Sequence, residues 1–239
     1  MILHTEIVGD GETIVFLHTG LQTGLTDFES QRNYFSQNYQ VIVPDLRGHG
    51  KSSHDDVSNF YYDSANDLLE TFTYLNIESA HIVGCSLGAV VGLLFAKTNP
   101  QKVKTLTLSG LTAEKPSNWA ELHQESVKHQ SELVRNDEIV TYFNQLHGEG
   151  WQRFIEMGKD ENFYPFDETR DLTNLQMTTL FMVGEGLESE RIGAILYPKL
   201  NKNVHVSIIP FASHLVHTEQ PELYTNVLEA FLDSNMKTG

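Results

Sequence analysis

The sequence predicts an α/β fold: a mostly parallel sheet of seven or eight strands with helices on both faces. Short apolar runs rich in β-branched residues recur along the chain, and stretches with helical periodicity separate most of them. This alternation is typical of right-handed crossovers between parallel strands. The chain of 239 residues is 40% hydrophobic and contains no linker rich in proline or serine, which favours a single domain over residues 1–239 with a sizeable core.

The N-terminal part of the chain predicts a hairpin. Two strand-like runs flank a Gly-Asp-Gly-Glu sequence at residues 9–12, a composition suited to a tight turn. The first run would lie at an edge of the sheet. The seven predicted strands are residues 2–8, 13–18, 40–44, 80–84, 103–109, 178–183 and 204–209, and helices are predicted at residues 63–75, 87–98, 188–200 and 221–234.

One segment breaks the alternation. Residues 112–175 contain three helical patterns, at 119–135, 137–146 and 150–157, without a convincing strand. We expect an inserted helical cap over the carboxyl edge of the sheet, where it would close an apolar pocket. Most of its aromatic residues should pack the cap onto the core. These residues are Trp119, Tyr142, Phe143, Trp151, Phe154, Phe163, Tyr164 and Phe166.

The sequence Gly-Cys-Ser-Leu-Gly at residues 84–88 is the most informative motif. It follows an apolar run of strand length and precedes a segment rich in Ala, Val and Leu. A Gly-x-Ser-x-Gly turn in that setting exposes the serine hydroxyl at a helix N-terminus, with small residues on both sides to permit the strained conformation. Ser86 is therefore the candidate nucleophile, and we expect the neighbouring Cys85 to serve packing.

Composition and charge restrict the partners. A net charge of −16 disfavours nonspecific contact with nucleic acid or an anionic membrane. The N-terminus has no signal-peptide pattern and no apolar run approaches membrane-spanning length, so we predict a cytoplasmic protein. One cysteine excludes an internal disulfide. We find no metal-ligand spacing and no phosphate-binding loop, and predict a small-molecule substrate without a cofactor.

Five landmarks occur in order along the chain. With them the chain resembles the α/β-hydrolase fold superfamily, in its serine esterase and lipase-like form with a small helical cap after the sixth family strand. The chain starts where the second family strand would lie, so the resemblance implies seven strands instead of eight. The landmarks are Phe-Leu-His-Thr-Gly at residues 16–20, Pro-Asp-Leu-Arg-Gly-His-Gly-Lys-Ser at 44–52, the serine turn at 84–88, Val-Gly-Glu at 183–185, and Phe-Ala-Ser-His at 211–214 followed by Glu-Gln-Pro-Glu at 219–222.

A serine hydroxyl needs a base near neutral pH, and His214 is the best candidate. It follows a predicted strand and precedes a helix, which places it at the carboxyl edge of the sheet with Ser86. His217 is the alternative, and we expect His81 to be a core residue of its strand. For the oxyanion, the N–H of Leu87 at the helix start is one expected donor.

The resemblance implies a second oxyanion donor at Gly20, two residues after His18. Thr19 stands there in place of the usual glycine, so Leu21 is an alternative donor. The catalytic acid is harder to identify, because Leu187 occupies the position where the family usually carries Asp.

We predict Glu188, adjacent to that position, as the acid that orients the imidazole of His214. Glu185, Glu190 and a Ser–His dyad without an acid stay open.

These residues predict a serine hydrolase that cleaves a small or medium ester-like substrate through an acyl-enzyme. Ser86 would attack the carbonyl, His214 would relay the proton, and water would release the acyl group. Two alternatives use the same fold. One is a cofactor-free hydrolase of C–C bonds or enol-lactones that uses Ser86 and His214. The other is a non-catalytic protein that binds small molecules.

Overall fold

The computed structural model describes residues 1–236 of the 239 and contains one seven-stranded sheet with the order β1-β3-β2-β4-β5-β6-β7. Neighbouring strands from β3 to β7 in this order are parallel, and only β1 runs antiparallel to its neighbour. The predicted α/β class and mostly parallel sheet are therefore confirmed, with seven strands. The strands are β1 (Thr5–Val8), β2 (Glu12–Leu17), β3 (Tyr39–Pro44), β4 (Ala80–Cys85), β5 (Val103–Ser109), β6 (Thr178–Gly184) and β7 (Val204–Ile209).

The predicted N-terminal hairpin is wrong, although β1 does lie at the edge of the sheet. β1 pairs with β3, while both edges of β2 are taken by β3 and β4. The glycine-containing turn crosses the start of β3: a Cβ atom on Gly9 would lie 2.3 Å from the carbonyl oxygen of Ser36 and 2.4 Å from that of Tyr39. The turn therefore carries the chain past β3, and no contact forms a β1–β2 ladder.

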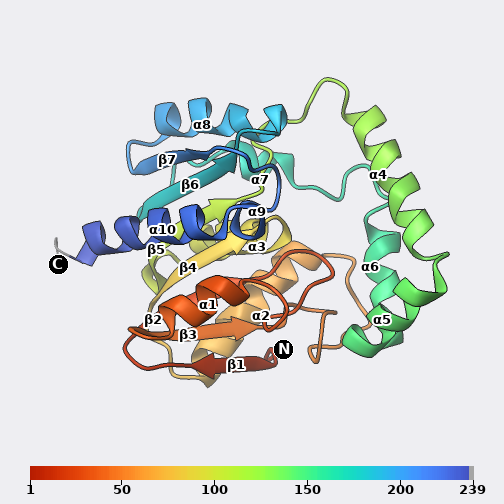
Figure 1. Ribbon diagram of the computed structural model, residues 1–239, viewed down its shortest axis with the longest axis horizontal. Coiled ribbons are helices and arrows are strands. Elements are labelled where there is room, and N and C mark those ends of the chain that lie inside the picture. Colours follow the sequence, from red (N-terminus) through yellow and green to blue (C-terminus); the bar gives the residue numbers. More distant parts are fainter. Residues whose placement is uncertain (237–239) are drawn as a thin grey trace.

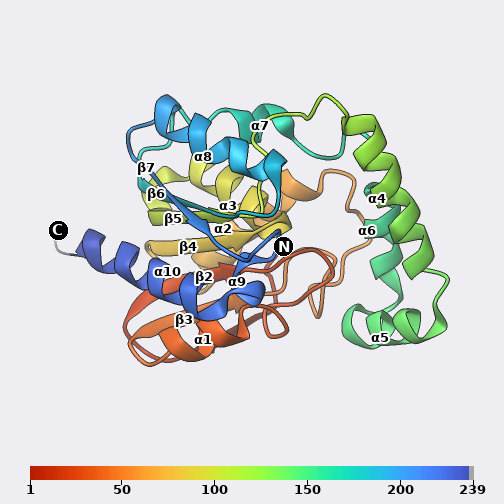
Figure 2. The same cartoon turned by 45° about the horizontal axis from the view of Figure 1, so that its top comes forward.

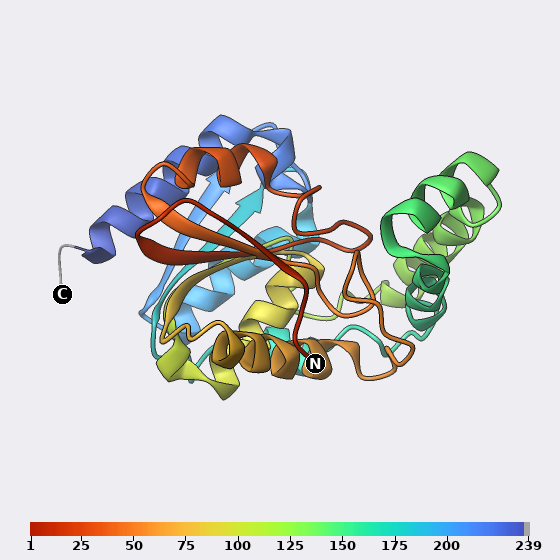
Figure 3. The same ribbon diagram turned by 90° about the horizontal axis from the view of Figure 1, so that it is seen from below.

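Helices cover both faces of the sheet, as Figure 3 shows from below. On one face, α1, α9 and α10 pack on a cluster of buried side chains that includes Phe28, Phe35 and Tyr224. On the other face, α2, α3 and α8 share a second cluster with the strands. The helices are α1 (Glu29–Phe35), α2 (Phe60–Tyr74), α3 (Leu87–Thr98), α8 (Glu188–Leu200), α9 (Val216–Glu219) and α10 (Pro221–Met236), with a short 3₁₀ turn η1 (Pro100–Lys102).

Helix α3 is the most deeply enclosed of these. Residues 87–96 are all buried, because the helix is apolar around its whole circumference. Its first turn lies against β2: a Cβ on Gly88 would be 2.1 Å from the carbonyl oxygen of Leu17. Only glycine allows this approach, which fixes the start of α3 against the centre of the sheet.

The helical insertion lies between β5 and β6; its helices α4, α5 and α6 form a lobe beside one end of the strands, whereas α7 lies against the main body (Figures 1 and 2). Phe154 and His147 of this lobe contact the loops that follow β2 and β3, so the lobe lies at the carboxyl ends of those strands. Trp151 is buried and packs on Phe143 with a ring-centroid distance of 4.9 Å. The elements are α4 (Trp119–Leu133), α5 (Asp137–His147), η2 (Glu149–Trp151), α6 (Gln152–Met157) and α7 (Phe166–Arg170).

Candidate active site

Ser86 lies at the tight turn between β4 and α3. Its backbone has φ 53° and ψ −116°, and its N–H donates to the carbonyl of Ser109 at 2.9 Å. A Cβ on Gly84 would meet the carbonyl oxygen of Gly88 at 2.4 Å. A Cβ on Gly110 would lie 3.0 Å from the backbone nitrogen of Ser86. Small residues around the turn therefore leave room for a strained, non-glycine residue at its apex.

Three side chains form one hydrogen-bonded chain. The Oγ of Ser86 lies 2.9 Å from Nε2 of His214, and Nδ1 of His214 lies 2.5 Å from Oε1 of Glu190. Burial acts to lower the pKa of His214, but the hydrogen bond and negative charge of Glu190 outweigh burial and raise it. An imidazole held in this way keeps its proton on Nδ1 and presents Nε2 to the serine hydroxyl.

The acid beside His214 is Glu190, which corrects the prediction of Glu188. Glu190 is 3% exposed, whereas Glu188 is exposed and lines a surface pocket with Lys115. Two residues along a helix rotate a side chain by about 200°, so the two glutamates point to opposite sides of α8. Glu190 is in phase with the buried residues Gly193 and Tyr197, a periodicity already present in the sequence.

Other glutamates near His214 hold backbone groups. Glu185 accepts a hydrogen bond from the N–H of Phe211 at 2.9 Å. Glu219 accepts from the N–H of Ser213 and from that of Leu215, both at 2.8 Å. Since these two donors flank His214, the carboxylate of Glu219 fixes the loop that carries the imidazole. Sequence reasoning did not assign this part to Glu219.

The two expected oxyanion donors lie at the ends of neighbouring strands. Leu87 is the first residue of α3, where backbone N–H groups have no partner within the helix. Gly20 follows β2, and a Cβ atom on Gly20 would lie 3.4 Å from a ring carbon of Phe154 in the cap. Leu21 has φ 60°. The cap thus covers the loop that carries Gly20 and Leu21.

Two histidines connect this loop to its surroundings. Nε2 of His18 accepts from the N–H of Leu46 at 2.9 Å, so Nδ1 carries the proton and donates to the carbonyl of Thr19 at 2.8 Å. In the same way, Nδ1 of His147 accepts from the N–H of Gly50 at 2.8 Å, and Nε2 donates to the carbonyl of Leu21 at 3.1 Å. Burial lowers the pKa of both histidines, which fits their neutral form.

The loop of residues 44–52 is structural. Asp45 accepts from the N–H of Gly24 and from that of Lys51, both at 2.9 Å. Arg47 binds the carboxylate of Asp67 on α2 through two nitrogens, at 2.8 and 3.1 Å. These charge-assisted bonds fix the loop against the N-terminal half of the sheet.

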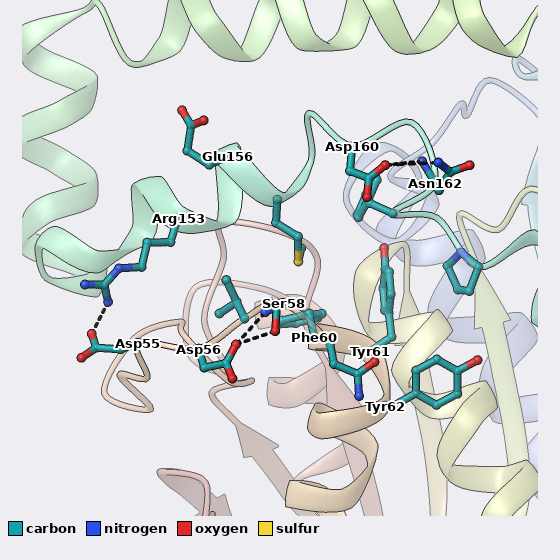
Figure 4. A pocket seen from close by; sticks show the side chains of 15 residues that line it. Asp55, Asp56, Ser58, Phe60, Tyr61, Tyr62, Arg153, Glu156, Asp160 and Asn162 are labelled. Atoms are coloured by element: carbon teal, nitrogen blue, oxygen red, sulfur yellow. Dashed lines mark hydrogen bonds and ion pairs between the residues drawn. The ribbon is translucent and has the colours of Figure 1, made fainter.

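A cavity of about 650 Å³ lies between the cap and the N-terminal end of α2. Its wall includes Tyr61, Met157 and Phe163, and Arg153 and Asp55, which also line it, form an ion pair (Figure 4). Ser86 is not among its lining residues. Within the described residues, no cluster of three or more His, Cys, Asp or Glu side chains is arranged to hold a metal ion.

A family model described as alpha/beta hydrolase fold matches residues 12–183, which is more than half of the chain. The chain belongs to this family. The match begins with β2, ends within β6 and includes the Ser86 turn. None of the helices within residues 1–236 is long and apolar enough to cross the bilayer.

Individual known proteins are similar to this chain at low identity. The sn-1-specific diacylglycerol lipase ABHD11 of Danio rerio is 25% identical over 257 residues, which covers 94% of this chain and 79% of the lipase. The carboxylesterase YbfK of Bacillus subtilis is 23% identical over 249 residues, which covers 95% of this chain and 82% of the esterase. The structure of NosK from Streptomyces actuosus has a TM-score of 0.82 and 25% sequence identity, covering 95% of this chain and 100% of that chain. Three uncharacterized proteins of Mycobacterium bovis and Mycobacterium tuberculosis are 35% identical over 103 residues, a match that covers 43% of this chain and only 30% of their length.

Proposed function

We propose that this α/β hydrolase is a serine hydrolase that cleaves a small or medium carboxylic ester through an acyl-enzyme. The observation that carries the proposal is the hydrogen-bonded chain from Ser86 through His214 to Glu190, with distances of 2.9 and 2.5 Å. Its geometry fulfils the requirement for an activated nucleophile: a base within reach of the hydroxyl and a third group that orients the base.

In the proposed first step, Nε2 of His214 takes the proton of Ser86 as Oγ attacks the ester carbonyl. The carbonyl oxygen becomes an oxyanion, which the N–H groups of Leu87 and Gly20 stabilise. His214 then gives its proton to the alkoxide that leaves, and the acyl group stays on Ser86. Glu190 stabilises the imidazolium in both transition states without taking the proton itself.

In the second step a water molecule replaces Ser86 as the nucleophile. His214 removes a proton from the water, the hydroxide oxygen attacks the acyl carbon, and the acid leaves as Oγ of Ser86 regains the proton. Esters are the favoured substrates because two relatives that cover most of the chain are a lipase and a carboxylesterase. Because the same fold hosts many chemistries, the fold does not select the acyl and alcohol groups of the substrate, and a panel of esters is needed to identify them.

The test is hydrolysis of p-nitrophenyl esters with acyl chains of two to eight carbons. We expect turnover by the wild type and a loss of about 10⁴-fold or more in kcat for Ser86→Ala. Ser234→Ala is the matched control, because the hydroxyl of Ser234 is exposed on α10 and donates to the carbonyl of Ala230; the activity of this variant should equal that of the wild type.

A fluorophosphonate probe gives a second readout. It should add to wild-type protein at Ser86 and leave Ser86→Ala unlabelled. A folded wild type that neither hydrolyses any ester of the panel nor reacts with the probe would contradict the proposal. Such a result, together with a ligand-dependent rise in Tm, would favour the binding-protein alternative instead.

A further inference from the structure

Thr19 is tied to a buried carboxylate. It immediately precedes Gly20, and its backbone N–H and its side-chain hydroxyl both donate to Oδ2 of Asp27, at 2.8 and 3.0 Å. Thr19 is 6% exposed and Asp27 is 4% exposed. The two hydrogen bonds fix the peptide that leads into Gly20, and water cannot compete for them.

The other oxygen of Asp27 is also fully used. Oδ1 lies 2.6 Å from Nε2 of His217 and accepts from the N–H of Phe28 at 3.0 Å. The ring of Phe28 stacks on that of His217 with a centroid distance of 4.1 Å. Gln31 donates to the carbonyl oxygen of His217 at 3.0 Å. Asp27 and His217 are therefore a second buried acid–histidine pair, separate from Glu190 and His214.

The electrostatics agree with an ionised Asp27. Burial alone would raise its pKa, but the hydrogen bond and the charge of His217, with the N–H of Thr19, lower it to about 2. Four donors converge on one buried carboxylate, an arrangement that requires all its lone pairs. An amide in the same place has one oxygen and could not accept on both sides.

This pair lies between the two loops that the proposed reaction needs. His217 belongs to α9, three residues after His214, and Glu219 at the end of α9 holds the backbone on both sides of His214. Thr19 lies in the loop that carries Gly20. One short path, from the His214 loop through α9 and Asp27 to Thr19, therefore connects the base to the expected oxyanion donor.

We propose that Asp27 and His217 are positioning residues for the oxyanion hole, which hold Thr19 so that the loop carrying Gly20 keeps a fixed distance from Ser86 and His214. This inference rests on the proposed function. An oxyanion donor acts only when it lies about 2.7–3.1 Å from the charged oxygen, and a misplacement of about 1 Å can cost about 100-fold in rate. A loop with its carboxylate anchor weakened should therefore bind substrate but stabilise the transition state poorly.

Four variants test the pair on p-nitrophenyl butyrate. We expect Asp27→Asn and His217→Leu, which removes the donor to Asp27, to lower kcat by about tenfold or more with KM within about twofold of the wild type, because the loss occurs in the transition state. Thr19→Ser keeps both donors and should retain wild-type kcat. Thr19→Val keeps the N–H donor alone and should fall between Thr19→Ser and Asp27→Asn.

His81→Leu is the control for loss of a buried histidine. His81 is 3% exposed and lies near the amino end of β4, where it bonds to Thr105 and pairs with Glu12. This variant should lower Tm and leave kcat near the wild-type value below the unfolding transition. A folded Asp27→Asn with unchanged kcat would overturn the inference, as would a loss in Thr19→Ser equal to that in Asp27→Asn. If Asp27→Asn does not fold, His217→Leu and Thr19→Val decide the matter on the same criteria.

Hydrogen–deuterium exchange separates this inference from the proposed function. In Asp27→Asn, the amides of residues 18–22 should exchange faster than in the wild type, and in His81→Leu they should not. Unchanged exchange in Asp27→Asn overturns the inference whether or not the protein is an esterase. A wild type without Ser86-dependent hydrolysis refutes the proposed function, and with it the oxyanion role of the loop, even where exchange does increase.

Discussion

Replacement of Glu190 by Gln is the sharpest test of the site. The substitution keeps the shape of the side chain and removes the charge that lies 2.5 Å from Nδ1 of His214. The carboxylate fixes the tautomer of His214 and stabilises its protonated form, and the neutral amide does neither as well. We expect kcat to fall by about 10²–10⁴-fold, equivalent to about 2.7–5.4 kcal/mol of transition-state stabilisation.

The pH profile gives a second, independent measure of the same charge. In the proposed mechanism His214 acts as a base only when neutral, and its pKa is raised, so kcat/KM of the wild type should rise through a midpoint above about 6.5. In Glu190→Gln the strongest influence that raises the pKa of His214 is gone, while the burial that lowers it and the smaller effect of Glu219 persist. The midpoint should therefore move to lower pH.

Glu188→Gln is the matched control, because Glu188 is exposed on the opposite side of α8 and has the same chemistry. Its kcat and pH midpoint should equal those of the wild type. The assay is steady-state hydrolysis of p-nitrophenyl butyrate between pH 5 and 9. The reasoning is refuted if Glu188→Gln loses as much activity as Glu190→Gln, or if Glu190→Gln keeps a wild-type rate and midpoint.

Three further predictions concern stability. Burial lowers the pKa of several histidines, His49 and His147 among them, so below about pH 6.5 these residues bind more protons in the unfolded chain than in the folded one. Tm should therefore fall from pH 7 to pH 5, although the raised pKa of His214 acts in the opposite direction. An unchanged Tm would contradict this. His147→Leu removes two hydrogen bonds between the cap and the loops after β2 and β3, and urea titration should show a loss of about 1–3 kcal/mol. Gly88→Ala places a Cβ at 2.1 Å from a backbone oxygen and should cost at least about 3 kcal/mol, whereas Gly150→Ala, whose Cβ meets one side-chain end at 3.8 Å, should cost less than about 1 kcal/mol.

The sequence was sufficient where a local pattern determines the structure. Helices α3 and α8 begin and end where their composition predicts, and the motif around Ser86 forms a turn because its neighbours are small. Strand pairing is a different matter. The turn at residues 9–12 is compatible with a hairpin, but competition among strands for the edges of β2 is decided by the whole sheet, and no local signal reports it.

The candidate site follows the same division. Ser86 and His214 lie in distinctive motifs. Three glutamates within six residues are candidates for the acid that orients the imidazole, and Glu188 was predicted because it is adjacent to the position where the family usually carries Asp. Helical phase with Gly193 and Tyr197 would have selected Glu190. Asp27 had no motif at all, because its partners at Thr19 and His217 are brought together only by tertiary structure.

The order of the strands has a consequence for when activity can first exist. Ser86 and His214 are 128 residues apart in sequence, and His214 follows β7, the last strand to be synthesised and the outermost strand at its edge of the sheet. Parallel sheets assemble through long-range contacts and fold slowly, and chains fold from the N-terminus as they are made. Ester hydrolysis should therefore appear late in refolding, after secondary structure has formed, and a nascent chain should stay inactive until its final strand has joined the sheet.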